Sequence, residues 1–244
     1  MFESDVLIST RAGQMPAFAA HPGTSDGPFA PVIFYMDAPG FRLELKNMAR
    51  RIAREGYFVL LPDLYYRLGT IRLKYDRTNE HVTAIMRAAL GSLDNQLIFE
   101  DTAAMLLHLD GQDVVKPGPV GVVGHCMSGA YVTTVAARFP SRVAAAASFY
   151  GTRIVTDQPD SPHLIAPQIK GEMLYSFAET DDHVSPETPG RIKDLLDSAG
   201  VRNEVEVVPG TQHAYCFPER ASYHPEAAEK AWEKLRALFA RTLK

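Results

Sequence analysis

The chain has 244 residues, 46% hydrophobic and 22% charged, with a formal net charge of −4 at pH 7. This composition excludes a disordered or fibrous chain, and the scattered Lys and Arg offer no basic surface, so no nucleic-acid partner is expected. No apolar run approaches the roughly 20 residues that span a bilayer, so no membrane partner is expected either.

The first half of the chain alternates short apolar runs with helical patterns. Its predicted elements, in chain order, are an antiparallel strand pair at 6–9 and 15–20, a buried strand at 31–36, a helix at 43–54, a strand at 57–61 and a helix at 98–109. Residues 65–93 are less regular, and we expect a loop with one helix that shapes the mouth of a pocket.

The second half continues the alternation. Its predicted elements are a strand at 119–123, a helix at 130–139, strands at 143–150 and 172–177, a helix at 191–199, a strand at 204–208 and a helix at 226–242. Strands that alternate with helices predict an α/β protein, with a mostly parallel sheet and helices on both faces.

The most informative motif joins the strand at 119–123 to the helix at 130–139. Gly124 and Gly129 flank Cys126, so one reactive residue lies between glycines at a sharp turn from strand to helix. This arrangement is the nucleophile elbow of α/β-hydrolases. We therefore expect one α/β-hydrolase domain over 1–244 with Cys126 as its nucleophile. An inert buried thiol is the structural alternative.

A cysteine nucleophile needs a histidine base and an acid that orients it. In α/β-hydrolases the nucleophile comes first in the chain, then the acid, then the histidine. Of the eight histidines, His213 fits this order best, because it follows the strand at 204–208 and precedes the last helix. His224 is the second choice, and a plain surface-loop histidine is the structural alternative for His213.

The acid is expected just after the strand at 172–177, where Asp181 and Asp182 are adjacent. The spacing between Asp181 and Val184 favours Asp181, although Asp182 and a simple turn or capping role remain open. An oxyanion hole needs backbone N–H groups, which we assign to Met127, directly after the nucleophile, and to Ala38, in the loop after the strand at 31–36.

No metal or cofactor is expected. The sequence contains no CxxC or HExxH spacing, and no GxGxxG follows a strand. The acidic N-terminus lacks the pattern of a signal peptide, and two cysteines cannot form a disulfide framework. A retained thiol suits a reducing compartment, so a cytoplasmic location is expected.

These residues resemble the dienelactone hydrolase family over nearly the whole chain. The resemblance rests on Gly56-Tyr57, Leu61-Pro62-Asp63-Leu64-Tyr65, the Gly-x-Cys-x-x-Gly elbow, Phe149-Tyr150-Gly151, the Asp181 loop, and Gly210 with His213. It implies that Cys126, Asp181 and His213 form the family's triad. It also places Asp37 where the family has a glutamate near the thiol, and a carboxylate there would hold the thiol protonated until substrate binds. A structural turn aspartate is the alternative.

The chain departs from the family at the arginines that bind a substrate carboxylate. Phe217 stands four residues after His213, where the family has one arginine. Val82 stands at the place of the other, with Arg77 and Arg87 nearby. An uncharged ester or lactone is therefore the better expected substrate.

The predicted function is a cysteine-dependent hydrolase of small carboxylic esters or lactones that works through an acyl-thioester intermediate. The alternatives are a broad carboxylesterase without lactone preference and a non-hydrolytic thiol sensor or binding module on the same fold. Cys216 is interpreted as a small apolar filler. We expect a monomer or a homodimer.

Overall fold

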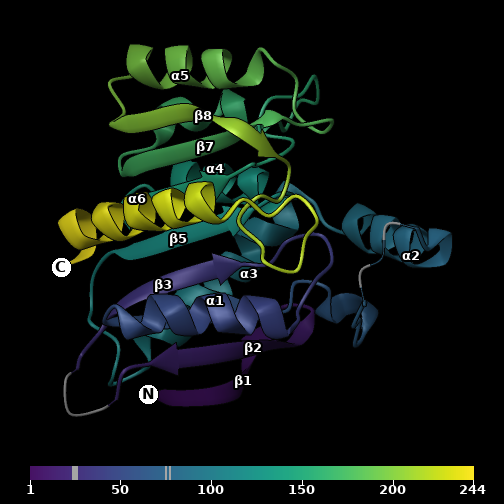
Figure 1. Ribbon diagram of the computed structural model, residues 1–244. Helices are drawn as coiled ribbons and strands as arrows, with labels where there is room; N and C mark the ends of the chain where they lie inside the picture. Colours follow the sequence, from purple (N-terminus) through teal and green to yellow (C-terminus); the bar gives the residue numbers. More distant parts are fainter. Residues whose placement is uncertain (24–26, 75, 77) are drawn as a thin grey trace. The chain divides into compact units, whose positions relative to one another are not determined.

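The computed structural model describes residues 1–23, 27–74, 76 and 78–244 (Figure 1). Contacts along the chain divide it into two compact units, Met1–Gly118 and Pro119–Lys244. Each unit is an α/β structure with its own strands and helices. The single domain over 1–244 stays a prediction.

The first unit contains four strands in the order β1-β2-β4-β3. They are β1 (Phe2–Thr10), β2 (Gly13–His21), β3 (Ala30–Tyr35) and β4 (Tyr57–Pro62). The β1–β2 and β2–β4 pairs are antiparallel and the β3–β4 pair is parallel. Every residue of β3 and β4 is buried, which agrees with their continuous apolar runs.

The helices of the first unit are α1 (Leu43–Arg54), α2 (Glu80–Gly91) and α3 (Asn95–Asp110), with a short 3-10 turn η2 (Tyr66–Leu68). Helix α1 buries Leu45, Ala49, Ile52 and Ala53, a spacing that puts one apolar stripe on a single helix face. This stripe packs on β2 and β4. The helix ends before Gly56, whose φ of 95° lies in the left-handed region that glycine adopts without strain.

The second unit contains four parallel strands in the order β5-β6-β7-β8. They are β5 (Val120–His125), β6 (Val143–Phe149), β7 (Glu172–Thr180) and β8 (Asn203–Gln212). The helices are α4 (Ser128–Arg138), α5 (Thr188–Ser198) and α6 (Pro225–Leu243), with 3-10 turns η3 (Pro162–Leu164) and η4 (Ala166–Gln168). Parallel strands end at the same edge of a sheet, so the loops after β5, β6, β7 and β8 share one edge.

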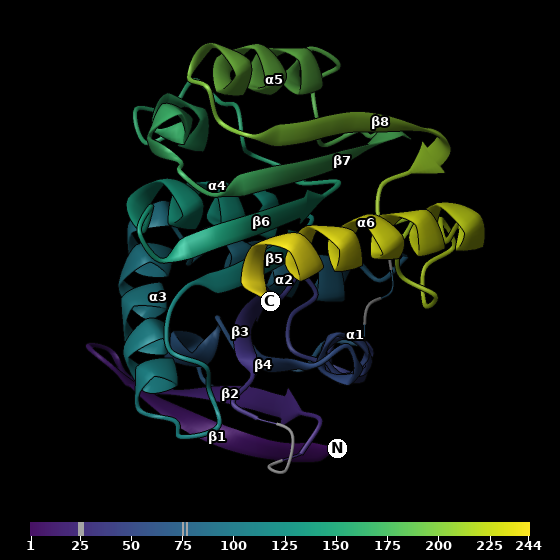
Figure 2. The same cartoon turned by 90° about the vertical axis from the view of Figure 1, so that its left-hand side faces the viewer.

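Helices cover both faces of this parallel sheet, with α4 on one side and α6 on the other (Figure 2). Two glycines of β5 show the contacts. A Cβ atom on Gly121 would lie 2.9 Å from Phe239 of α6, and one on Gly124 would lie 2.8 Å from Val132 of α4. Glycine at these positions lets both helices approach the strand closely.

The fold class predicted from the sequence is confirmed: the protein is α/β, its strands are mostly parallel, and helices pack on them. Helix α1 has the predicted bounds. The main differences are longer strands at the end of the chain, since β7 and β8 continue to Thr180 and Gln212. Within 65–93 the structure has η2 and α2. None of the helices in the described part of the chain is long and apolar enough to cross a membrane.

Candidate active site

The elbow after β5 holds Cys126 in an unusual backbone conformation. Cys126 has a φ of 56°, in the left-handed region that non-glycine residues seldom adopt. Its N–H donates to the carbonyl of Phe149 at 3.1 Å, and its carbonyl accepts N–H groups of Gly129 at 3.0 Å and Thr152 at 2.8 Å. These three bonds fix the turn against the end of β6, so they support the strained residue from both sides.

Close packing at this turn requires Gly129. A Cβ atom there would lie 2.3 Å from the Cα of Gly151 and 2.8 Å from the Oγ of Ser148. Because a backbone atom cannot move aside as a flexible side chain can, no larger residue fits without displacing the turn. The close contact between the elbow and the loop after β6 therefore explains why residue 129 is a glycine.

The pairing of β7 with β8 brings the predicted acid and base together. Thr180 and Gln212 are partners in the register, so the next residues, Asp181 and His213, leave the two strands side by side. The His213 N–H also donates to the Thr180 carbonyl at 3.2 Å. The Nδ1 of His213 lies 2.7 Å from the Oδ2 of Asp181, a distance typical of a charge-assisted hydrogen bond.

Both side chains of this pair are shielded from solvent, with exposed fractions of 13% for His213 and 4% for Asp181. Asp182, the alternative acid, is exposed. The other oxygen of Asp181 accepts the N–H of His183 at 2.9 Å. Asp181 is thus held at both oxygens, and it orients the imidazole so that Nε2 is left for a reaction partner.

The imidazole of His213 is also within hydrogen-bond reach of the Cys126 side chain. Burial alone would lower the pKa of His213, but the hydrogen bonds to Asp181 and Cys126 and the negative charges of both partners outweigh it. They raise the pKa to about 10. The hydrogen bond to Asp181 and the nearby Cys126 side chain therefore favour a protonated imidazole at His213.

Aromatic rings enclose this imidazole. The ring of Tyr150 contacts that of His213 edge to face, with centroids 5.2 Å apart, and the ring of His183 does the same at 4.9 Å. From the sequence, Tyr150 fits a pocket-lining role and core packing equally well, and nothing in the sequence places the ring of His183 at the imidazole. Their role depends on the distance between the loops after β6, β7 and β8, which no local pattern encodes.

Among the described residues, four that are not glycine have a positive φ, and all four belong to the second unit. They are Cys126 at 56°, Tyr150 at 39°, Arg153 at 59° and Ala214 at 71°. Each lies after the end of β5, β6 or β8. Backbone strain concentrated at one edge of a sheet is typical of a functional site.

The other predicted histidine has a structural role. The Nδ1 of His224 accepts the N–H of Ala227 and caps α6. His125 is buried, and its ring packs on Phe149 and Phe217.

Phe217 has no exposed surface and packs on His125 and Tyr150. At the place of the family's arginine, this chain therefore has a ring that fills space in the second unit. Of the residues considered for the other arginine, Val82 and Arg87 lie on α2. Arg77 lies outside the described residues.

Asp37 and Ala38 lie in the first unit, in the turn after β3. The buried Asp37 carboxylate forms a two-pronged ion pair with Arg42, with Nη2 and Oδ2 3.0 Å apart. The carbonyl of Ala38 accepts the hydroxyl of Tyr65 at 2.7 Å. The charge of Asp37 is thus balanced within its own loop. Its action on the thiol, and the Ala38 and Met127 amides as oxyanion donors, stay predictions.

Both cysteines are free thiols. Burial raises the pKa of Cys216 far above that of an ordinary thiol, although the neighbouring hydroxyls of Tyr215 and Tyr150 oppose the shift. Cys216 therefore stays protonated and unreactive at neutral pH. Among the described residues, no group of three or more His, Cys, Asp or Glu side chains is arranged to hold a metal ion.

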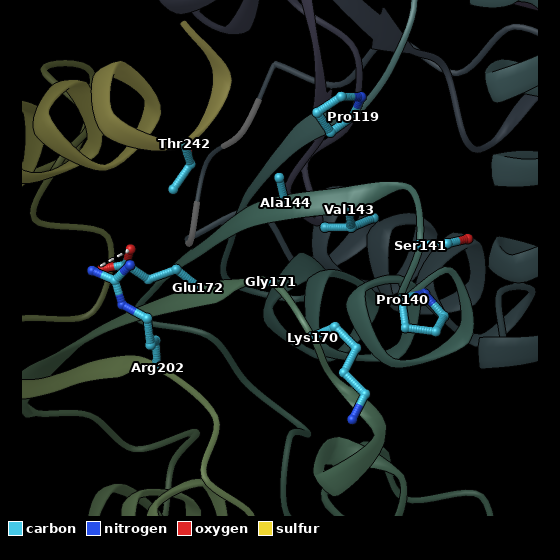
Figure 3. Close-up of a pocket in the computed structure, with 10 residues that line it drawn as sticks. All are labelled: Pro119, Pro140, Ser141, Val143, Ala144, Lys170, Gly171, Glu172, Arg202 and Thr242. Carbon is cyan, nitrogen blue, oxygen red and sulfur yellow. Dashed lines mark ion pairs between the residues drawn. The ribbon is translucent and has the colours of Figure 1, made fainter.

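A cavity of about 310 Å³ lies at the other end of the second unit's sheet (Figure 3). Pro119, Val143 and Glu172, at or next to the starts of β5, β6 and β7, are among its lining residues. Cys126 follows the end of β5, one strand length away. This cavity is therefore distinct from the candidate active site.

The chain matches the model of the dienelactone hydrolase family over residues 15–243. A relative from Methylorubrum extorquens, assigned as a carboxymethylenebutenolidase, is 27% identical, with 98% of this chain and 81% of the relative covered. A Synechocystis protein with the same assignment is 28% identical, with 98% and 96% covered.

Solved structures show the same fold. A Klebsiella pneumoniae protein assigned as a dienelactone hydrolase has a TM-score of 0.85 at 24% identity, with 98% of each chain covered. A dienelactone hydrolase-like promiscuous phosphotriesterase from metagenomic libraries has a TM-score of 0.80 at 20% identity, with 99% of each covered. The match to the family model spans almost the whole chain, so this protein belongs to the dienelactone hydrolase family.

Proposed function

We propose that this hydrolase cleaves small uncharged carboxylic esters or lactones with Cys126 as nucleophile, through an acyl-thioester intermediate. One observation carries the proposal: the His213 imidazole, hydrogen-bonded to Asp181, lies close to the side chain of Cys126 at a strained elbow. An inert core thiol needs neither the left-handed backbone nor a shielded imidazole oriented by a carboxylate.

In the first half of the reaction, Cys126 attacks the carbonyl carbon as a thiolate, with its proton held on Nε2 of the His213 imidazolium. The oxygen of the tetrahedral intermediate becomes negative, and we assign its stabilisation to the Met127 amide at the start of α4, with Ala38 as the predicted second donor. The C–O bond to the leaving group then breaks, and the imidazolium gives its proton to the departing oxygen.

In the second half, water attacks the thioester carbonyl while His213 takes one of its protons. The C–S bond breaks, the carboxylic acid leaves, and the thiolate of Cys126 is restored beside the imidazolium. Asp181 holds the imidazole in one tautomer throughout and stabilises its positive charge. No step requires an added metal or cofactor.

Charge and packing support an uncharged substrate. Phe217 occupies the position of an arginine that would bind a carboxylate, and its ring is buried against His125 and Tyr150. We keep the cytoplasm as the expected compartment, because the mechanism needs Cys126 reduced.

The test is turnover of p-nitrophenyl acetate, a neutral lactone and a dienelactone carboxylate under reducing conditions. We expect the two neutral substrates to be hydrolysed. Cys126→Ala should abolish turnover, whereas the matched control Cys216→Ala should keep it, because the raised pKa of that thiol keeps it protonated. Equal turnover by Cys126→Ala and wild type would refute the thiol mechanism. A folded protein with no turnover would favour a thiol sensor.

A further inference from the structure

Ser176, in the middle of β7, binds two segments of the candidate site at once. Its side chain has no exposed surface. Its carbonyl accepts the N–H of Tyr150 at 2.7 Å, and its hydroxyl lies 2.8 Å from the hydroxyl of Tyr215. Tyr150 begins the loop after β6, and Tyr215 lies two residues after His213. Ser176 therefore connects the loop that contacts the imidazole with the loop that carries it.

The direction of these hydrogen bonds follows from Glu206 on β8. The Ser176 hydroxyl lies 2.7 Å from Oε1 of Glu206, and Lys234 of α6 binds the other carboxylate oxygen. An ionised carboxylate only accepts hydrogen bonds, so Ser176 donates its proton to Glu206. The Tyr215 hydroxyl must then donate to the Ser176 oxygen. The charge of Glu206 thus sets one direction for the whole row.

Contacts between aromatic rings connect these hydrogen bonds to the imidazole of His213. The ring of Tyr215 packs edge to face on that of Tyr150 at 5.2 Å, and the ring of Tyr150 packs in the same way on the imidazole of His213 at 5.2 Å. Tyr150 and Ala214 both have a positive φ, 39° and 71°. Such backbone conformations persist only where the surroundings fix them, and the Ser176 and Tyr215 bonds supply that restraint.

We propose that Glu206, Ser176 and Tyr215 form a positioning network that fixes the imidazole of His213 through the ring of Tyr150. None of the three touches the reacting atoms. The inference rests on the proposed function only in that His213 acts there as the base. It assigns a role to three residues that the proposed Cys126–His213–Asp181 triad does not include.

The variant that tests the network is Tyr215→Phe, which removes one hydroxyl and keeps the ring. A small displacement of a catalytic group lowers the rate of the chemical step more than it weakens substrate binding. We expect kcat to fall about 10-fold with KM nearly unchanged. Glu206→Gln should cause a similar loss. Because both changes interrupt the same row, the double variant should lose little more than either single variant.

Tyr175→Phe is the matched control. Tyr175 is the neighbour of Ser176 on β7, and its buried hydroxyl bonds Thr133 on α4 at 2.9 Å. The control removes an equally buried hydroxyl without touching the network, so it should keep wild-type kcat. If it lowers kcat as much as Tyr215→Phe does, the effect is general destabilisation and the network is refuted.

A second readout needs no substrate. The imidazole resonances of His213 can be titrated by 1H–15N NMR, and the hydrogen bonds that raise its pKa depend on its position. Tyr215→Phe should lower the midpoint of this titration, and Tyr175→Phe should leave it unchanged. An unchanged midpoint in Tyr215→Phe overturns the inference. If the wild type hydrolyses no ester, the proposed function fails, but this titration still decides the network.

Discussion

Replacement of Asp181 by Asn removes the charge behind the base with almost no change in size. Asp181 and His213 are 2.7 Å apart and largely shielded from water. A hydrogen bond to a charged group contributes about 1.5–3 kcal/mol. At about 1.4 kcal/mol for each factor of ten, its loss corresponds to about a 10- to 150-fold decrease in kcat/KM. This is a lower bound, since Asn can also stabilise the wrong imidazole tautomer.

The assay is steady-state hydrolysis of p-nitrophenyl acetate from pH 6 to pH 11, with circular dichroism to establish folding. Asp182→Asn is the control, because Asp182 is adjacent but exposed. We expect it to keep near-wild-type kcat/KM. Asp181→Asn should also lose activity at a lower pH than wild type, because the bond that raises the pKa of His213 is gone. Retention of more than half the activity by Asp181→Asn would refute the assignment, as would an equal loss in Asp182→Asn.

Three further predictions concern packing, pH and a buried charge. Gly129→Ala should lower the free energy of unfolding by about 3 kcal/mol because the new methyl group meets backbone, whereas Gly190→Ala, with open space around it, should be neutral or slightly stabilising in the same urea titration. The pKa of His213 rises from 6.5 to about 10 on folding, so its contribution to the free energy of unfolding is complete below pH 6.5 and is lost as the pH rises through about 10. In urea titrations at pH 6, 8 and 10, the free energy of unfolding should therefore fall more in wild type than in His213→Ala. An equal decrease in the two proteins would contradict this. Arg67→Ala should destabilise the protein by about 3 kcal/mol, because it leaves the Asp101 carboxylate, which is 1% exposed, without its ion-pair partner; an unchanged melting temperature would count against this estimate.

The sequence predicts helices and strands well where regularly spaced apolar residues or a continuous apolar run determine the structure. Helix α1 has the predicted bounds because its apolar stripe and Gly56 define both its face and its end. Strand β8 is longer than predicted, since the predicted strand ends at residue 208 but Pro209 and Gly210 lie within β8. A register shift between β7 and β8 accommodates the irregular region, and such a shift depends on the neighbouring strand.

In the candidate site, too, some features follow from local sequence and others from neighbouring strands and loops. Cys126 can be identified from its own glycines, because the elbow is a local motif. The spacing to Val184 favours Asp181 over Asp182 but leaves both open, whereas the pairing of Thr180 with Gln212 brings Asp181 next to His213. The rings of Tyr150 and His183 around the imidazole are likewise a consequence of how three loops meet at one edge of the sheet. The spacing of residues along the sequence does not predict this arrangement of the loops.

The most direct test of the central claim is to trap the acyl-enzyme. The protein is mixed with p-nitrophenyl acetate, quenched in acid within the first turnovers, and examined by intact-mass and peptide mass spectrometry. We expect the acetylated protein to be about 42 Da heavier than the free protein, with the acetyl group on Cys126 and no such species in Cys126→Ala. Rapid hydrolysis with no adduct on Cys126, or an adduct on another residue that persists in Cys126→Ala, would contradict it.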